Sequence, residues 1–130
     1  MSFAKGDVIV NYTHVWKDTN EHEAKQARDC LIAIVENDGK TYYLTLSTHN
    51  HTAWEFYQKY PEWNYLLTKK KCEWISENSV VNLKLINNAT PMGKFIFSVS
   101  DKVMKDMIRK FKEWQEANPD PLYEEIKKIL

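Results

Sequence analysis

Residues 26–51 read QARDCLIAIVENDGKTYYLTLSTHNH, and they predict two antiparallel strands joined by a tight turn. The segment 30–35 is continuously apolar and rich in β-branched side chains, which is typical of a buried strand. Asp38 and Gly39 tolerate the positive φ angles of a hairpin turn, so we expect the chain to reverse there. Along 42–47, apolar residues alternate with more polar ones, which predicts a partner strand with one buried face.

The two outer ends of this hairpin carry side chains that are suited to chemistry. Arg28 stands where the first strand begins, and Ser47 and Thr48 stand where the second strand ends. Because a hairpin brings its outer ends together, we expect these groups to meet His49 and His51 at one open edge. Hydroxyls beside a guanidinium can hold a phosphate group and stabilise its negative charge. The histidines are compatible with proton transfer, with a metal pair or with no role.

The composition is that of one globular domain. The chain has 130 residues and a formal net charge of +0, which gives no sign of a broad electrostatic surface for nucleic acid. It contains no apolar run of the ~20 residues that a membrane span needs, and its N-terminus lacks the apolar core of a signal peptide. We therefore expect a cytoplasmic protein without membrane contact, in which Cys30 and Cys72 are small buried residues.

The remaining periodicity predicts the other elements of a single domain that covers residues 1–130. Strands are expected over 6–13, 80–86 and 94–99, with a less regular one over 69–75, and helices are expected over 52–60, 101–117 and 122–130. Trp54 and Tyr57 should face inward, and Ser100 should cap the helix that follows it. These elements predict an α+β, mainly β domain: a small antiparallel barrel or strongly curved sheet with peripheral helices, including a long C-terminal helix.

Aromatic and basic residues crowd the middle of the chain. The aromatic ones are Trp54, Tyr57, Tyr60, Trp63 and Tyr65, and the basic run is KKK at 69–71. Such rings can stack on unpaired bases, or they can fill the core of a small barrel. The lysines can follow a phosphate backbone, or they can keep a sheet edge soluble.

Several short motifs follow one another along the chain. KGDVIV opens a strand at 5–10, a segment containing Glu at 21–25 precedes Arg28 and the apolar strand, and LST closes the next strand at 46–48. Farther on, SVVNL stands at 79–83 and VSDKVM at 99–104. In this order the motifs resemble the MazF/PemK family, the small endoribonuclease toxins of bacterial toxin–antitoxin systems.

The resemblance implies an SH3-like barrel, often a homodimer, that cuts single-stranded RNA without a metal or another cofactor. The substrate's own 2′-OH would attack the phosphorus and leave a 2′,3′-cyclic phosphate and a 5′-OH. By position, Arg28 would stabilise the charge on the phosphorus, and Ser47 and Thr48 would hold the phosphate. We add His49 or His51 as a proton carrier. The further residues expected to contact the RNA are Trp16, Lys25, Gln26, His51, Lys69 and Lys70. The expected inhibitor is a cognate antitoxin, either a protein or a structured RNA.

Two other functions remain open from the sequence. A non-catalytic small barrel could bind nucleic acid or peptide through the aromatic residues between Tyr57 and Trp74. An interaction protein could instead use Phe111 and Trp114 of the helix predicted over 101–117 as a contact surface.

Overall fold

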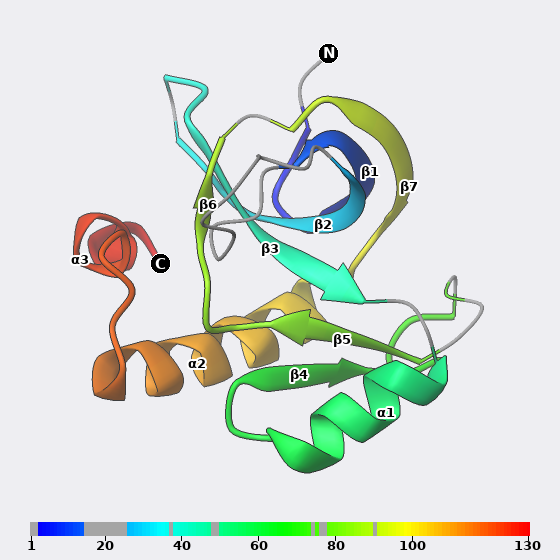
Figure 1. Ribbon diagram of the computed structural model, residues 1–130. Helices are drawn as coiled ribbons and strands as arrows, with labels where there is room; N and C mark the ends of the chain where they lie inside the picture. Colours follow the sequence, from blue (N-terminus) through cyan, green and yellow to red (C-terminus); the bar gives the residue numbers. More distant parts are fainter. Residues whose placement is uncertain are drawn as a thin grey trace.

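The computed structural model describes residues 3–14, 26–36, 38–47, 50–73, 75, 78–89 and 91–130 (Figure 1). For 13–14, 26–28 and 50–53 it describes the backbone alone. No helix within these ranges is long and apolar enough to cross a membrane.

The described strands form one seven-stranded antiparallel sheet. They are β1 (Asp7–His14), β2 (Gln26–Val35), β3 (Thr41–Ser47), β4 (Asn64–Leu67), β5 (Ser79–Asn82), β6 (Asn87–Asn88) and β7 (Gly93–Ser98). The order across the sheet is β4-β5-β3-β2-β1-β7, and β6 pairs with β3 beside this path. The sheet is strongly curved, with β1, β2 and β7 curling over at one end (Figure 1). The prediction of a mainly β, α+β domain with antiparallel strands is confirmed.

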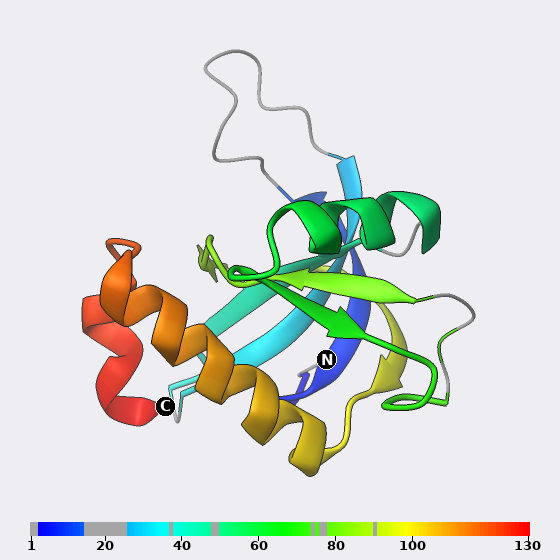
Figure 2. The same ribbon diagram turned by 90° about the horizontal axis from the view of Figure 1, so that it is seen from below.

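Of the two predicted forms, the structure has the strongly curved sheet, and the prediction of a barrel is wrong. In the part of the chain that the structure describes, β4 and β7 end the sheet on its two sides and do not pair. Helix α2 (Asp101–Ala117) lies across the sheet (Figure 2) and places Met104, Met107 and Phe111 in the main core. Its Lys110 Nζ also donates to the backbone oxygen of Asn64 in β4, at 3.1 Å. The apolar stripe of α2 therefore covers part of the core. In a closed barrel, pairing of the two edge strands would enclose these residues instead.

The helix predicted over 101–117 is confirmed, and so is its N-cap. The Ser100 hydroxyl accepts the backbone N–H of Val103 at 3.3 Å, as a capping serine does. This helix is not the C-terminal element, however. Pro119 and Pro121 follow α2 and prevent it from continuing. The chain then ends in the short helices α3 (Tyr123–Ile126) and η1 (Lys127–Ile129). The prediction of a long C-terminal helix is therefore wrong. Phe111 is fully buried in the protein's own core, which argues against a free contact surface there.

Strand β3 and residues 30–34 of β2 are buried on both faces, not on one face as predicted for β3. Leu31 and Leu44 belong to the main core, whereas Ile32 and Tyr43 belong to a second apolar cluster with Ile9 and Cys30. The register shifts between Ile32 and Ile34, and the extra residue, Ala33, turns into the main core together with Ile34. This bulge and the two covered faces explain why 30–35 is apolar without alternation.

The middle of the chain departs most from the sequence prediction. The segment 69–75, predicted as a strand, forms turns in its described residues, and the backbone N–H groups of Lys71 and Cys72 both donate to the Thr68 oxygen. Strand β4 was not predicted, and it pairs with the whole of β5. The strand predicted over 80–86 stops at Asn82, because the Asn82 side chain accepts the N–H groups of Lys84 and Leu85 and turns the chain.

A buried glutamine joins α2 to two loops. The side chain of Gln115 is fully buried, and its Nε2 donates to the backbone oxygens of Leu83 at 2.8 Å and Lys84 at 3.2 Å. Its Oε1 accepts the N–H of Asp120 at 2.7 Å. Asp120 in turn accepts the N–H groups of Ile86 and Leu122. These bonds fix where the chain leaves β5 and where it turns after α2.

We expect Gln115→Leu to lower the free energy of unfolding by about 2–4 kcal/mol, because a side chain of similar size leaves two carbonyls and one N–H without this partner. Urea unfolding of both proteins measures the difference. The matched control is Gln58→Leu on the exposed face of α1 (Asn50–Lys59), which should change stability by less than about 0.5 kcal/mol. Equal stability of the Gln115→Leu and Gln58→Leu proteins would contradict the assignment of Gln115 as a structural link.

Candidate functional site

Positions from four strands meet where β3 and β4 end and β5 begins, and we call this region the open end of the sheet. Asp29 pairs with Leu46, so the next residue outward on each strand is Arg28 on β2 and Ser47 on β3. Adjacent strands lie about 5 Å apart, so the backbones of these two residues are neighbours. Ser47 also pairs with Val80 of β5, and its side chain is half-buried. The structure thus brings together, at the level of the backbone, the two hairpin ends that the sequence placed at one edge.

Asn11, which pairs with Arg28 on the side away from β3, holds the open end in place. Arg28 pairs with Asn11 of β1, whose side chain is 1% exposed. The Asn11 Oδ1 accepts the N–H of Met92 at 3.1 Å, and its Nδ2 donates to the Tyr43 hydroxyl at 3.3 Å. This amide holds three separate segments together, so the backbone that carries Arg28 lies on a fixed strand pair rather than on a free loop.

Two of the predicted RNA-contacting lysines lie at the same end of the sheet. Val80 pairs with Ser47 on one side and with Leu66 of β4 on the other, so the chain leaving β4 emerges two strands from Ser47, about 10 Å away. Lys69 and Lys70 follow in an exposed turn.

Lys70 lines a cavity between this turn and the start of α2. The volume of the cavity is about 580 Å³, and Lys71, Lys102 and Asp106 also line it. The hydroxyl of Tyr65 donates to the Asp106 carboxylate at 2.7 Å, and Arg109 pairs with the same carboxylate at 2.9 Å. These bonds, that of Arg109 first, hold the pKa of Asp106 below its usual value. The lysines therefore dominate the accessible charge of this cavity.

The other predicted site residues lie outside the described residues, wholly or in part. Trp16, Lys25, Thr48 and His49 are not described at all. For Gln26 and Arg28 the structure gives the backbone within β2, and for His51 the backbone in the first turn of α1. Their proposed contacts with RNA therefore stay predictions.

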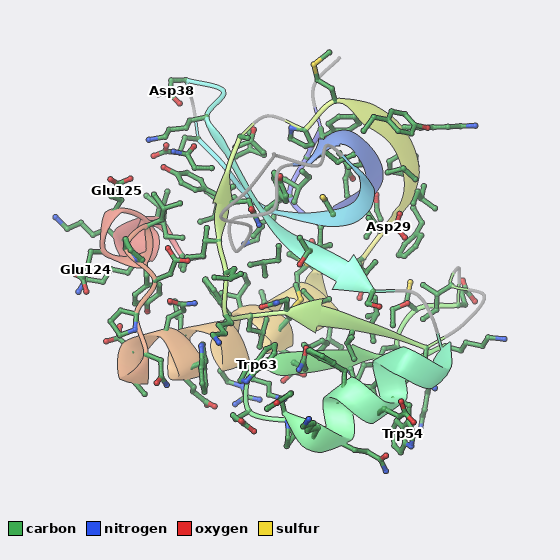
Figure 3. The ribbon with its side chains drawn as sticks, viewed as in Figure 1. Asp29, Asp38, Trp54, Trp63, Glu124 and Glu125 are labelled. Atoms are coloured by element: carbon green, nitrogen blue, oxygen red, sulfur yellow. The ribbon has the colours of Figure 1, made fainter. Side chains whose placement is uncertain are left out.

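A second group of residues was only partly found from the sequence. Trp54 and Phe56 are 44% and 41% exposed, so Trp54 does not face inward as predicted, and Tyr57 is half-buried. Beyond them, a groove of about 520 Å³ runs between α1 and the chain that enters β4. Its lining residues are Glu55, Phe56, Lys59, Tyr60, Trp63 and Lys84. Figure 3 shows Trp54 and Trp63 toward opposite ends of α1. The density of aromatic residues was visible in the sequence, but the pairing of Lys59 and Lys84 with these rings was not.

The described residues give no cluster of three or more His, Cys, Asp or Glu side chains that could hold a metal ion. No protein-family model matches the chain, and a search of the curated proteins likewise finds no match. The chemistry of the open end and of the groove has to be inferred from their own residues.

Tyr43 makes the stability of the fold sensitive to alkaline pH. Burial raises the pKa of the Tyr43 phenol from 10.0 to about 12, and the neighbouring Cys30 adds to the rise, while the hydrogen bond from Asn11 opposes it. The unfolded chain therefore loses this proton at lower pH than the folded protein does. The resulting stability is fully present below pH 10 and is lost as the pH rises to about 12.

We expect Tyr43→Phe to cost about 1 kcal/mol of stability at neutral pH, because the Asn11 amide loses this acceptor. Between pH 10 and 12 the variant should lose stability less steeply than the wild type does, because it has no phenol to ionise at this position. Urea midpoints measured at several pH values test both statements, and Tyr12→Phe controls for the removal of a hydroxyl from an exposed ring. Parallel curves for the wild type and Tyr43→Phe would refute the role of Tyr43.

Proposed function

We propose that this protein is a metal-independent endoribonuclease that cuts single-stranded RNA at the open end of the sheet. The observation that carries the proposal is the strand register, which makes the backbones of Arg28 and Ser47 neighbours on paired strands. A guanidinium and a hydroxyl at neighbouring strand positions can bind a phosphate group and stabilise the negative charge that builds up on it during the reaction. The motif resemblance to the MazF/PemK toxins supports the same assignment.

The proposed reaction needs no group outside the protein and the RNA. The oxygen of the 2′-OH forms a bond to the adjacent phosphorus, and the bond from phosphorus to the 5′ oxygen breaks. The products are a 2′,3′-cyclic phosphate and a 5′-OH, so the proton lost by the 2′-OH is balanced by the proton gained by the leaving oxygen. Arg28 stabilises the added negative charge, Ser47 and Thr48 hold the phosphate, and His49 carries a proton.

Local charge rather than net charge would bind the RNA. The chain has a formal net charge of +0, so a long-range attraction for nucleic acid is absent. Lys69 and Lys70 are exposed at the same end of the sheet as Ser47, and Lys102 lines the same cavity as Lys70. Cations concentrated in this way bind phosphates at short range, with an affinity that falls as salt rises.

The proposed cellular role is that of the toxin in a bacterial toxin–antitoxin pair. The proposal includes a cytoplasmic location, inhibition by a cognate antitoxin of protein or structured RNA, and a possible homodimer. Growth arrest on expression, relieved by a gene encoded beside this one, would test the role separately from the chemistry.

A non-catalytic module that binds nucleic acid or peptide is the second candidate function. The observation that favours it is the groove of exposed aromatic rings and lysines beside α1, which needs no reaction at the open end. The two candidates differ in whether RNA is cut or only held.

Arg28→Ala should reduce RNA cleavage by about 100- to 1,000-fold, because the developing charge loses its main donor. The assay incubates wild type and variant with a long single-stranded RNA in excess EDTA and analyses the ends of the fragments. The matched control is Lys128→Ala, which removes an exposed cation from η1 that lines neither the groove beside α1 nor the cavity beside Lys70. This control should cleave at the wild-type rate.

Discrete fragments with 5′-OH ends from the wild type and Lys128→Ala, but not from Arg28→Ala, are the expected result. Thermal melting of all three proteins separates loss of activity from loss of folding. Intact RNA with every protein, together with a gel shift on the same samples, would reject the endoribonuclease and leave the binding module. Equal cleavage by Arg28→Ala and the wild type would remove Arg28 from the mechanism.

A further inference from the structure

We infer that the groove beside α1 binds unpaired nucleotides of single-stranded RNA, through base contacts on its aromatic rings and phosphate contacts on Lys59 and Lys84. The choice of RNA as the ligand rests on the proposed function. The existence of a binding surface for a planar, anionic ligand rests on the groove itself.

Helix α1 presents its aromatic residues in an unusual way. From Trp54 to Lys59, no described side chain of α1 is buried, although three of the six are aromatic. A helix of a small domain normally buries its aromatic rings, since each ring removes a large apolar area from water. Phe56 is instead 41% exposed at the mouth of the groove. Rings gathered on a surface in this way are typical of an interaction site.

The rings are arranged in an ordered group. Tyr60 and Trp63 stack with their centroids 4.9 Å apart and their planes at 27°. Phe56 meets both of them edge-on, at 5.5 Å from Tyr60 and 5.4 Å from Trp63. The three rings hold one another in place without being covered by the core. A preformed group of this kind loses little side-chain entropy when it binds a ligand.

Two lysines place their ammonium groups over the same rings. The Nζ of Lys59 lies 5.4 Å from the Tyr60 ring centroid, and the Nζ of Lys84 lies 5.3 Å from the Trp63 ring centroid. Lys59 comes from the end of α1 and Lys84 from the turn after β5, so distant segments place positive charge at one spot. Of the described residues that line the groove, Glu55 is the acidic one.

The combination of rings and cations favours a nucleotide over other occupants. An apolar partner helix would cover the rings but would leave the two ammonium groups desolvated without an anion. An acidic peptide would satisfy the lysines but would offer no flat surface to the rings. A nucleotide supplies a planar base for the rings and a phosphate for Lys59 or Lys84, the two components of single-strand recognition.

The position of the groove fits one strand of RNA that also reaches the open end. Helix α1 begins at Asn50, shortly after Ser47 at the end of β3, and ends at Lys59 in the groove. Ten helical residues span about 15 Å, and the three-residue step from Ser47 to Asn50 adds at most about 10 Å, so the groove lies within about 25 Å of the proposed cleavage site. Nucleotides a few positions along the strand from the cleaved bond can therefore be held by the groove.

The test measures binding to a 2′-O-methyl RNA, which lacks the attacking hydroxyl and cannot be cut. Fluorescence anisotropy gives the dissociation constants for the wild type, Phe56→Ala, Trp63→Leu and the double variant Lys59→Gln/Lys84→Gln. Each groove variant should bind about 10-fold more weakly or worse, because a base–ring or phosphate contact is lost. The controls are Phe95→Ala, which removes a 48% exposed ring on β7, and Lys105→Gln on the exposed face of α2.

Cleavage of long RNA by the wild type is measured in parallel, so that the two proposals can fail separately. Weakened binding by the groove variants supports the groove even if the wild type cuts no RNA, in which case the endoribonuclease alone fails. Unchanged binding by the groove variants overturns the groove even if the wild type cuts RNA. If the variants lose binding of polyglutamate while their RNA binding is unchanged, the groove binds an acidic peptide. That result would also overturn the proposal. Thermal melting identifies variants that do not fold. If the aromatic variants do not fold, RNA binding by the Lys59→Gln/Lys84→Gln variant decides the test.

Discussion

The antiparallel pairing of β2 with β3 is the constraint on which the remaining structure depends. Residues 30–34 of β2 and most of β3 are buried on both faces, so a shift of one residue would move large apolar side chains between the two clusters that they form. The bulge at Ala33 adjusts this register so that Ile34 also enters the main core. Because the pairing starts with Asp29 opposite Leu46, it also sets Arg28 beside Ser47 at the open end. Core packing and the proposed reaction thus rely on the same register.

Buried polar groups hold this sheet rigid, and the accessible candidate binding residues lie on its outside. Asn11, Tyr43 and Gln115 are buried polar groups whose hydrogen bonds tie strands, loops and α2 together. On the outside, α1 carries aromatic rings and Lys59, which the core does not use, and Lys84 lies beside them. A chain without net charge can still recognise an anion in this way, because binding depends on where the cations stand and not on their total.

Sequence patterns predicted the elements whose periodicity is strong. The hairpin of β2 and β3, the strand β7, helix α2 and its Ser100 cap were all recognisable, since each combines a regular apolar spacing with a definite start or stop signal. Strand β4 was not predicted, because four residues are too few to show a period. The lysine-rich turn after it was wrongly predicted as a strand. For the candidate site, the sequence indicated the hairpin ends and the aromatic surplus, and it missed Lys59 and Lys84.

The sequence by itself determined the local choices: which segments are apolar on two faces, where Asp38-Gly39 reverses the chain, and where Ser100 starts a helix. Tertiary structure decided everything that depends on distant residues meeting. It left the sheet open and covered its core with α2, it made Gln115 a buried link to Leu83 and Asp120, and it brought Lys84 to the Trp63 ring. The physical reason is that backbone conformation follows from neighbouring residues, whereas burial and hydrogen-bond partners follow from the packing of the whole chain.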